Sequence, residues 1–207
     1  MSSENKTIIL DTAERFFARK GFSASTLRSI TKEANVNVAS VNYYFGSKER
    51  LITEVLSRIF RPLNMRRAEL LSDAIQKFHP HAVPLRDILN ALIRPILEMV
   101  FSTSHTQAML VLRRCMSEEG NFIEEAIKND LNSLIERFLG LLCQTLPEIP
   151  REELRWRLHF VIGTAVHTAC LCEKSLKNTP SLQLEDVLRE LLDYTAAGFA
   201  HPGTAAS

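Results

Sequence analysis

Apolar residues recur at three- and four-residue spacing along almost the whole chain, which is the period of an α-helix buried on one face. Leu27, Ile30 and Ala34 are a short example, and Ile9, Ala13 and Phe16 begin a longer one. No stretch sustains the two-residue alternation typical of a half-buried strand. The pattern therefore predicts an all-α protein.

Ser25–Lys48 predicts two short helices joined by a tight turn. Thr26 or Ser25 can cap the first of them, because a side-chain oxygen there can accept a free backbone N–H. Asn35 can adopt the left-handed conformation that ends a helix. Asn37 can then cap a second helix. Its inward residues would include Val41 and either Tyr44 or Phe45. Two such helices over a small core are typical of a helix-turn-helix, whose second helix can enter a major groove.

Longer helices are predicted on both sides of this stretch. One runs over about residues 6–20 and ends at Gly21. Another begins after Ser47 and extends through Arg67, with Pro62 expected to kink or break it. His79–Pro84 is the best candidate for a linker. The remaining helical patterns are Leu85–Phe101 with a kink at Pro95, Thr106–Ser117, Phe122–Leu146, Arg151–Lys174 and Leu182–Phe199.

Charge is distributed unevenly along the chain. Its 207 residues carry a net charge of only +1. The first 67 residues hold twelve Lys and Arg against six Asp and Glu, a net charge of +6, and the remainder carries −5. A basic N-terminal part on a mildly acidic body is typical of a protein that binds a polyanion through one domain.

Composition bounds the compartment and the redox state. With no uncharged apolar run of about 18 residues, a membrane-spanning helix is not expected. The first six residues are polar and lack the apolar stretch of a signal peptide, which favours the cytoplasm. The four cysteines, at positions 115, 143, 170 and 172, show no disulfide-scaffold spacing. Reduced thiols are therefore expected, with metal binding a distant second interpretation.

The sequence offers little for catalysis. It contains no H-E-x-x-H, no G-x-S-x-G, no glycine loop for phosphates and no dinucleotide fingerprint. His79 and His81 flank Pro80 without further obvious ligands, and a buried histidine is the commoner explanation of His159 and His167. We expect no enzymatic activity, no cofactor and no metal.

Residues 8–51 carry a longer signature, which reads I-I-L-D-T-A-E-R-F-F-A-R-K-G-F, then T-L-R-S-I-T-K-E-A-N-V, then V-A-S-V-N-Y-Y-F-G-S-K-E-R-L. It resembles the tetracycline-repressor (TetR) family of transcriptional regulators. The resemblance implies a helix-turn-helix DNA-binding domain over 1–50, a helical ligand-binding and dimerisation domain over 51–200, and a disordered tail over 201–207. Asn35 stands where the family usually has Gly, and Asn42 where most members have Tyr, which leaves the operator sequence open.

The second helix of the motif supplies the candidate DNA contacts. Its outward residues can bond a base edge, meet a thymine methyl group or reach a phosphate; they are Asn37, Val38, Ala39, Asn42 and Tyr43. The resemblance places phosphate contacts at Thr26, Arg28, Tyr44 and Lys48. The alternative is that Asn37 is only a cap and Tyr44 only a core residue.

The pattern over Arg151–Lys174 is apolar on nearly every side, and the last helix has a similarly broad apolar face. A helix covered all round suggests the chain's own core on one side and a second subunit on the other. The resemblance likewise implies a homodimer built from this pair and its two-fold copy. The candidate interface residues are Trp156, Phe160, Gly163, Leu188 and Leu192. The alternative is a single monomeric core.

The body also offers apolar helices with few inward polar groups, which suits a small hydrophobic ligand. The candidate ligand-binding residues are Phe101, Met109, Arg113, Phe138 and His167. V-N-Y-Y-F together with W-R-L-H-F-V-I-G-T-A resembles a fatty-acid-responsive subgroup of the family. That would make an acyl compound the ligand, with Arg113 at its carboxylate or thioester. The alternative is that these residues are simply core.

The sequence thus favours a homodimeric repressor that leaves a palindromic double-stranded DNA operator when a small hydrophobic ligand binds. The rival hypothesis from another class is a helical protein–protein adaptor or ligand carrier that does not depend on DNA. An activator, or a regulator without a ligand, fits the same residues.

Overall fold

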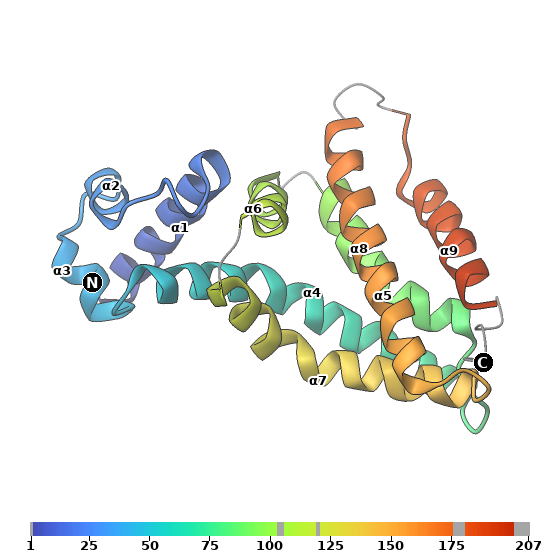
Figure 1. Cartoon of the computed structure of the whole chain (residues 1–207). Coiled ribbons are helices and arrows are strands. Elements are labelled where there is room, and N and C mark those ends of the chain that lie inside the picture. Colours follow the sequence, from blue (N-terminus) through green and yellow to red (C-terminus); the bar gives the residue numbers. More distant parts are fainter. Residues whose placement is uncertain (1, 103–105, 119–120, 176–180, 201–207) are drawn as a thin grey trace. The chain divides into compact units, whose positions relative to one another are not determined.

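The computed structural model describes residues 2–102, 106–118, 121–175 and 181–200, and in these it is all-α, as predicted (Figure 1). None of its helices is long and apolar enough to cross a membrane. The helices are α1 (Ser2–Lys20), α2 (Leu27–Glu33), α3 (Val38–Tyr44), α4 (Lys48–Phe78), α5 (Leu85–Phe101), α6 (Thr106–Ser117), α7 (Asn121–Thr145), α8 (Arg151–Ser175) and α9 (Leu184–Ala200).

Most predicted helices agree with these bounds to within two residues, and the predicted linker separates α4 from α5. The exceptions are α1, which begins earlier, and α4. The helix α4 runs through Arg67 as expected and continues to Phe78, and the expectation of a break at Pro62 is wrong, because Pro62 lies inside α4. Pro62 is exposed. A proline that faces solvent removes one backbone hydrogen bond from a helix of 31 residues and leaves the apolar stripe intact.

The chain forms two compact units, one of Met1–Pro62 with His105–Leu131 and the other of Leu63–Ser104 with Asn132–Ser207. The boundaries of these units differ from those of the predicted domains, because α6 belongs to the first unit. This first unit, which contains the helix-turn-helix, is called the head below. The tail over 201–207 lies outside the described residues.

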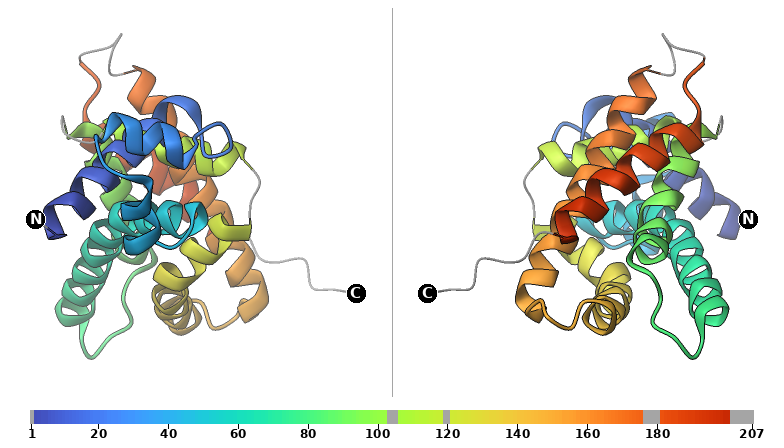
Figure 2. Two further views of the ribbon diagram at one scale, coloured as in Figure 1. Left: turned by 90° about the vertical axis from the view of Figure 1, so that its left-hand side faces the viewer. Right: turned by 90° about the vertical axis from the view of Figure 1, so that its right-hand side faces the viewer.

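The core of the first unit is built on α1. Phe16 and Phe17 lie buried on one side of α1, and the ring of Phe17 lies 5.2 Å from that of Phe22. Ile30 of α2 and Val41 of α3 are fully buried. The helix α6 also packs on α1, beside it in the views of Figures 1 and 2.

The predicted caps and turns of the head are confirmed. Thr26 Oγ1 accepts a hydrogen bond from the N–H of Ser29 at 3.1 Å. Ser25 is buried instead, and its hydroxyl donates to the carbonyl of Gly21 at 2.6 Å. Asn35 has a φ of 53°, the left-handed conformation expected for the turn. Asn37 Oδ1 accepts from the N–H of Ala39 at 2.9 Å.

The second unit is organised around α5, which packs against both α8 and α9. Ten residues of α5 are buried, among them Ile88, Leu92 and Ile96. The guanidinium group of Arg94 on α5 donates to both carboxylate oxygens of Glu185 on α9, at 2.7 and 3.0 Å.

Arg67 of α4 is the buried cation of this unit. It is 6% exposed and donates to two neutral acceptors, the carbonyl of Leu92 at 3.1 Å and Asn64 Oδ1 at 2.9 Å. Burial lowers the pKa of Arg67 to about 10. The charge persists at neutral pH, so Arg67 serves as a hydrogen-bonded strut between α4 and α5.

The first prediction concerns the small core of the head. Phe17→Ala removes a ring that is 0% exposed and should cost about 3–5 kcal/mol of stability. Hydrogen exchange should show that amide protection falls in α1, α2 and α3 more than in α5 and α8. Met65→Ala, at a side chain that is 60% exposed, is the control and should leave both sets unchanged. Uniform loss of protection across both units would contradict a separate head core.

Candidate nucleic-acid interface

The helix α3 presents a continuous exposed surface. Val38 is 40% exposed, Tyr43 is 80% exposed, and Ala39 and Asn42 also face solvent. The opposite side of this helix is buried through Val41, with Phe45 just beyond its end. One face of α3 is therefore fixed against the head while the other offers amide, methyl and hydroxyl groups.

Two of the candidate contacts have structural partners as well. Asn37 caps α3 through its Oδ1, as predicted, and the residue is exposed. Tyr44 is half-buried, with its ring edge-on to Tyr43 at 5.0 Å and to Phe45 at 6.3 Å. Of the inward pair left open by the sequence, Phe45 is the buried one.

Some cations of the head pair with carboxylates, such as Arg19 with Glu33 at 3.1 Å and Arg58 with Asp11 at 2.6 Å. Within the described part of the chain, others have no carboxylate partner, among them Lys20 and Arg61. Four of these others flank α3 in the sequence, at α2 and at the start of α4; they are Arg28, Lys32, Lys48 and Arg50. Their charges remain available to an external polyanion.

Lys48 is held at the N-terminus of α4. Its Nζ donates to the carbonyl of Ser23 at 3.3 Å, and Ser47 caps the helix by accepting from the N–H of Arg50 at 3.2 Å. The pKa of the Glu49 carboxyl group is lowered. The largest cause is a hydrogen bond with its own backbone N–H, and the next is a hydrogen bond with the Ser47 side chain. A helix N-terminus with a lysine beside it is favourable for phosphate.

Sequence reasoning missed two residues of this region. Ser23 supplies the carbonyl that holds Lys48, and Glu118 binds the backbone of Ser23 from α6. No local pattern could have indicated a contact between residues 95 positions apart.

The predicted ligand-binding residues belong to both units. Met109 and Arg113 belong to the first unit, whereas Phe101 and Phe138 belong to the second. Met109 and Phe138 are buried, and Arg113 and Phe101 are partly buried. The expectation that His167 faces inward is wrong, because its side chain is exposed on α8. His159 lies eight residues earlier on the same side of α8 and is also exposed, so this side faces solvent and not the core.

The predicted dimer residues also divide. Trp156 and Phe160 are each 64% exposed and Gly163 is exposed, so among the described residues α8 has an uncovered apolar face. Leu188 and Leu192 of α9 are only 2% and 6% exposed. Their assignment to an interface is wrong, since α9 uses this stripe against its own chain, where it packs on α5. Periodicity alone cannot tell the two kinds of cover apart.

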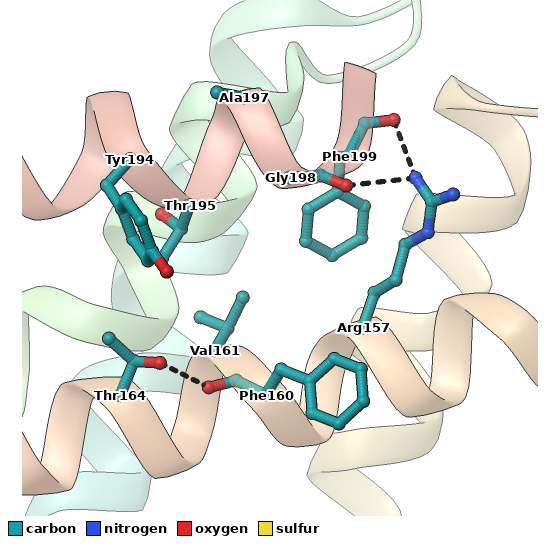
Figure 3. A pocket seen from close by; sticks show the side chains of 9 residues that line it. All are labelled: Arg157, Phe160, Val161, Thr164, Tyr194, Thr195, Ala197, Gly198 and Phe199. Atoms are coloured by element: carbon teal, nitrogen blue, oxygen red, sulfur yellow. Dashed lines mark hydrogen bonds between the residues drawn. The ribbon is translucent and has the colours of Figure 1, made fainter. Parts of the chain in front are cut away.

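A hollow of about 410 Å³ lies between α8 and α9 on this side of the second unit (Figure 3). The exposed rings of Phe160 and Tyr194 border it. At one end, Arg157 donates to the carbonyls of Gly198 and Phe199 at 3.1 and 2.9 Å, which joins α8 to the last turn of α9. None of the five predicted ligand-binding residues lines this hollow.

The four thiols are free, and burial raises the pKa of Cys115 to about 12. Burial also raises the pKa of Cys172. Thiols protonated in this way are poor nucleophiles and poor metal ligands at neutral pH. Over the described residues, no three His, Cys, Asp or Glu side chains gather into a metal site.

Comparison with known proteins agrees with the geometry of the head and extends it to the body. Residues 9–55 match the family of bacterial regulatory proteins called the tetR family. Residues 90–198, more than half of the chain, match the tetracyclin repressor-like C-terminal domain. The chain belongs to the TetR family. It is a transcriptional regulator with an N-terminal helix-turn-helix domain and a helical C-terminal domain.

Similarity to curated relatives covers only part of the chain. The probable HTH-type transcriptional regulator YttP of Bacillus subtilis is 38% identical over 60 residues, 29% of each chain. The repressor NicS of Pseudomonas putida is 37% identical over 65 residues, 31% of each chain. The chain therefore aligns with only about three-tenths of the length of these relatives.

Solved structures share the whole TetR-family fold. A TetR-like regulator from Rhodococcus sp. RHA1 has a TM-score of 0.64 at 18% identity, with 95% of this chain and 96% of that chain covered. NalD of Pseudomonas aeruginosa, the secondary repressor of the MexAB-OprM multidrug efflux pump, has a TM-score of 0.64 at 21% identity with the same coverage.

The second prediction separates DNA contact from folding on α3. Asn42 is exposed, so Asn42→Ala should leave the melting temperature unchanged. It should weaken binding to the preferred duplex by about 1–3 kcal/mol, the typical worth of one bidentate base contact. Fluorescence anisotropy and thermal melts measure the two effects. Asn132→Ala, at an exposed asparagine of α7, is the matched control and should change neither. Unchanged affinity in Asn42→Ala would remove this residue from the interface.

Proposed function

We propose that this TetR-family regulator is a homodimeric repressor, acting in the cytoplasm, that leaves a palindromic operator when a small hydrophobic ligand binds. The observation that carries the DNA-binding part is the exposed surface of α3 between cations without carboxylate partners. An adaptor or ligand carrier would have no use for that combination. Repressors among the similar proteins, including NicS and the biofilm operon regulator IcaR of Staphylococcus aureus, support the repressive sense.

The dimensions of α3 suit a major groove. Seven residues rise about 10 Å, and the groove is about 12 Å wide. Asn42 can bond an adenine edge, and Val38 and Ala39 can meet a thymine methyl group. Arg28 and Lys48 would bind phosphates on either side. Two heads related by a two-fold axis would read half-sites about 34 Å apart, which explains why the operator should be palindromic.

The exposed face of α8 is the proposed dimer contact, with a second copy of the chain as its occupant. An isolated subunit would leave the rings of Trp156, Phe160 and Tyr194 in water. Leu171 of α8 is also half-exposed. On α8, Gly163 lies between Phe160 and Leu171 and allows close approach of a second helix. The hollow between α8 and α9 can then receive side chains of the partner.

The proposed ligand is hydrophobic, and Phe138 of the second unit is an apolar, buried residue that can line a site for it. Ligand binding would release DNA by favouring a head spacing that no longer matches successive grooves. Long-chain acyl compounds are the first probes to test, because of the sequence resemblance to the fatty-acid-responsive subgroup.

The third prediction tests the function directly. Selection from a randomised duplex library should enrich a palindromic site. Native mass spectrometry of the complex should show two chains on each duplex, and copies of the chain that retain a lipid-like molecule should be absent from DNA. A protein that ignores duplex DNA of every sequence at low ionic strength would contradict the proposal. A single chain per duplex would contradict the dimeric part alone.

The fourth prediction concerns the face of α8. Charges at two ring positions, Trp156→Glu with Phe160→Glu, should abolish dimerisation, because two-fold symmetry would bury four carboxylates together. Sedimentation velocity measures the subunit count. Met65→Glu, at another side chain that is 60% exposed, should leave the dimer intact. A dimer that survives the double substitution places the contact on another surface.

A further inference from the structure

The turn that follows α1 leaves backbone N–H groups without helical partners. Gly21 ends the helix with a φ of 82°, and its own N–H bonds the carbonyl of Phe17 at 2.9 Å. The N–H groups of Phe22 and Ser23 follow and point to a carboxylate from α6. Glu118 Oε1 accepts from Phe22 at 3.1 Å, and Oε2 accepts from the N–H and hydroxyl of Ser23 at 2.9 and 3.1 Å.

A second residue of the same segment completes the clamp. Arg114 Nη2 donates to the carbonyl of Arg19 at 3.2 Å, one residue before the end of α1. The carbonyl end of a helix attracts a cation, and the amides beyond it attract an anion. The end of α6 presents both charges in the matching order, four residues apart.

Gly21 provides the room for this arrangement. A Cβ atom built at Gly21 would lie 2.1 Å from Glu118 Oε1, closer than any real contact. The positive φ favours glycine at this position, and a side chain here would displace the end of the Glu118 side chain.

The clamp reaches the candidate DNA contact through Ser23. Glu118 fixes the N–H and the hydroxyl of Ser23, while the carbonyl of the same residue accepts from Lys48 Nζ at 3.3 Å. An ammonium group has three donors. The Ser23 carbonyl uses one, so the other two can be directed toward a phosphate at the N-terminus of α4.

We propose that Glu118 is a positioning residue for DNA binding: it holds the turn at Ser23 so that Lys48 is set for its phosphate. The inference rests on the proposed function, because it assumes that Lys48 contacts DNA. It adds a residue of α6, remote in sequence from the helix-turn-helix, to the determinants of operator affinity.

If Glu118 acted only through its negative charge, removing its carboxylate would strengthen DNA binding. Glu118→Gln raises the net charge by one, which should tighten binding to a polyanion. The positioning role predicts weaker binding, because the amide replaces an acceptor with a donor facing the N–H of Ser23 or Phe22. The sign of the effect therefore distinguishes the two.

The fifth prediction measures this sign on the duplex selected with the full-length wild-type protein. Glu118→Gln should weaken binding about fivefold or more, and the slope of log affinity against log salt should shrink by about 0.9, the loss of one phosphate contact. Lys48→Ala should give the same change in slope. The double variant should bind no more weakly than Lys48→Ala alone. Glu69→Gln, which removes an exposed carboxylate of α4, controls for charge and should bind as tightly as the wild type or more tightly.

Thermal melts accompany each measurement, and Glu118→Asp, which keeps the charge, should recover part of the affinity lost in Glu118→Gln. The inference would be overturned if Glu118→Gln bound DNA with wild-type affinity and salt slope. It would also be overturned if the double variant lost affinity by the product of the two single losses, because the residues would then act independently. If Glu118→Gln does not fold, Glu118→Ala, which also removes the carboxylate, takes its place, and wild-type affinity and salt slope in Glu118→Ala would overturn the inference equally. Failure of the wild type to select any duplex would instead overturn the proposed function.

Discussion

The central constraint on this molecule is that its recognition helix is too short to be stable alone. A helix of seven residues does not form in isolation, because nucleation is unfavourable and few hydrogen bonds follow it. The conformation of α3 therefore depends on its cap at Asn37 and on the burial of Val41 and Phe45 in the head. That core in turn depends on the aromatic side of α1, which also receives α6. Surface groups on α3 are positioned only as well as this small core allows.

The charged side chains of the head differ in whether they are paired. The ion pairs of Arg19 and Arg58 neutralise cations where helices pack, at positions that have no need of free charge. Exposed pairs of this kind contribute little to stability, so their main effect is on the distribution of charge. Four cations without a carboxylate partner, Arg28, Lys32, Lys48 and Arg50, lie in α2 and at the start of α4, next to the recognition helix in the sequence. Part of the excess positive charge of the first 67 residues is therefore available to a phosphate backbone there.

Local features of the fold could be predicted from sequence, whereas partners of surfaces could not. Asn35 and Asn37 indicated their turn and cap because both effects act within three residues. The stripe of α8 indicated two apolar faces, but the similar stripe on α9 holds Leu188 and Leu192 against its own chain. Periodicity reports that a face is covered and not by what. A break at Pro62 was a possible expectation because the sequence does not show that Pro62 faces solvent, and Glu118 was missed because its partners are remote in sequence.

The exposed position of Trp156 has a practical consequence. It is the sole tryptophan of the chain, so the intrinsic indole emission of the protein arises from one known site on the uncovered side of α8. An indole in water emits at longer wavelength than one enclosed by apolar groups. The unlabelled protein thus carries its own optical reporter of the proposed association between subunits, readable on dilution and through the access of a soluble quencher.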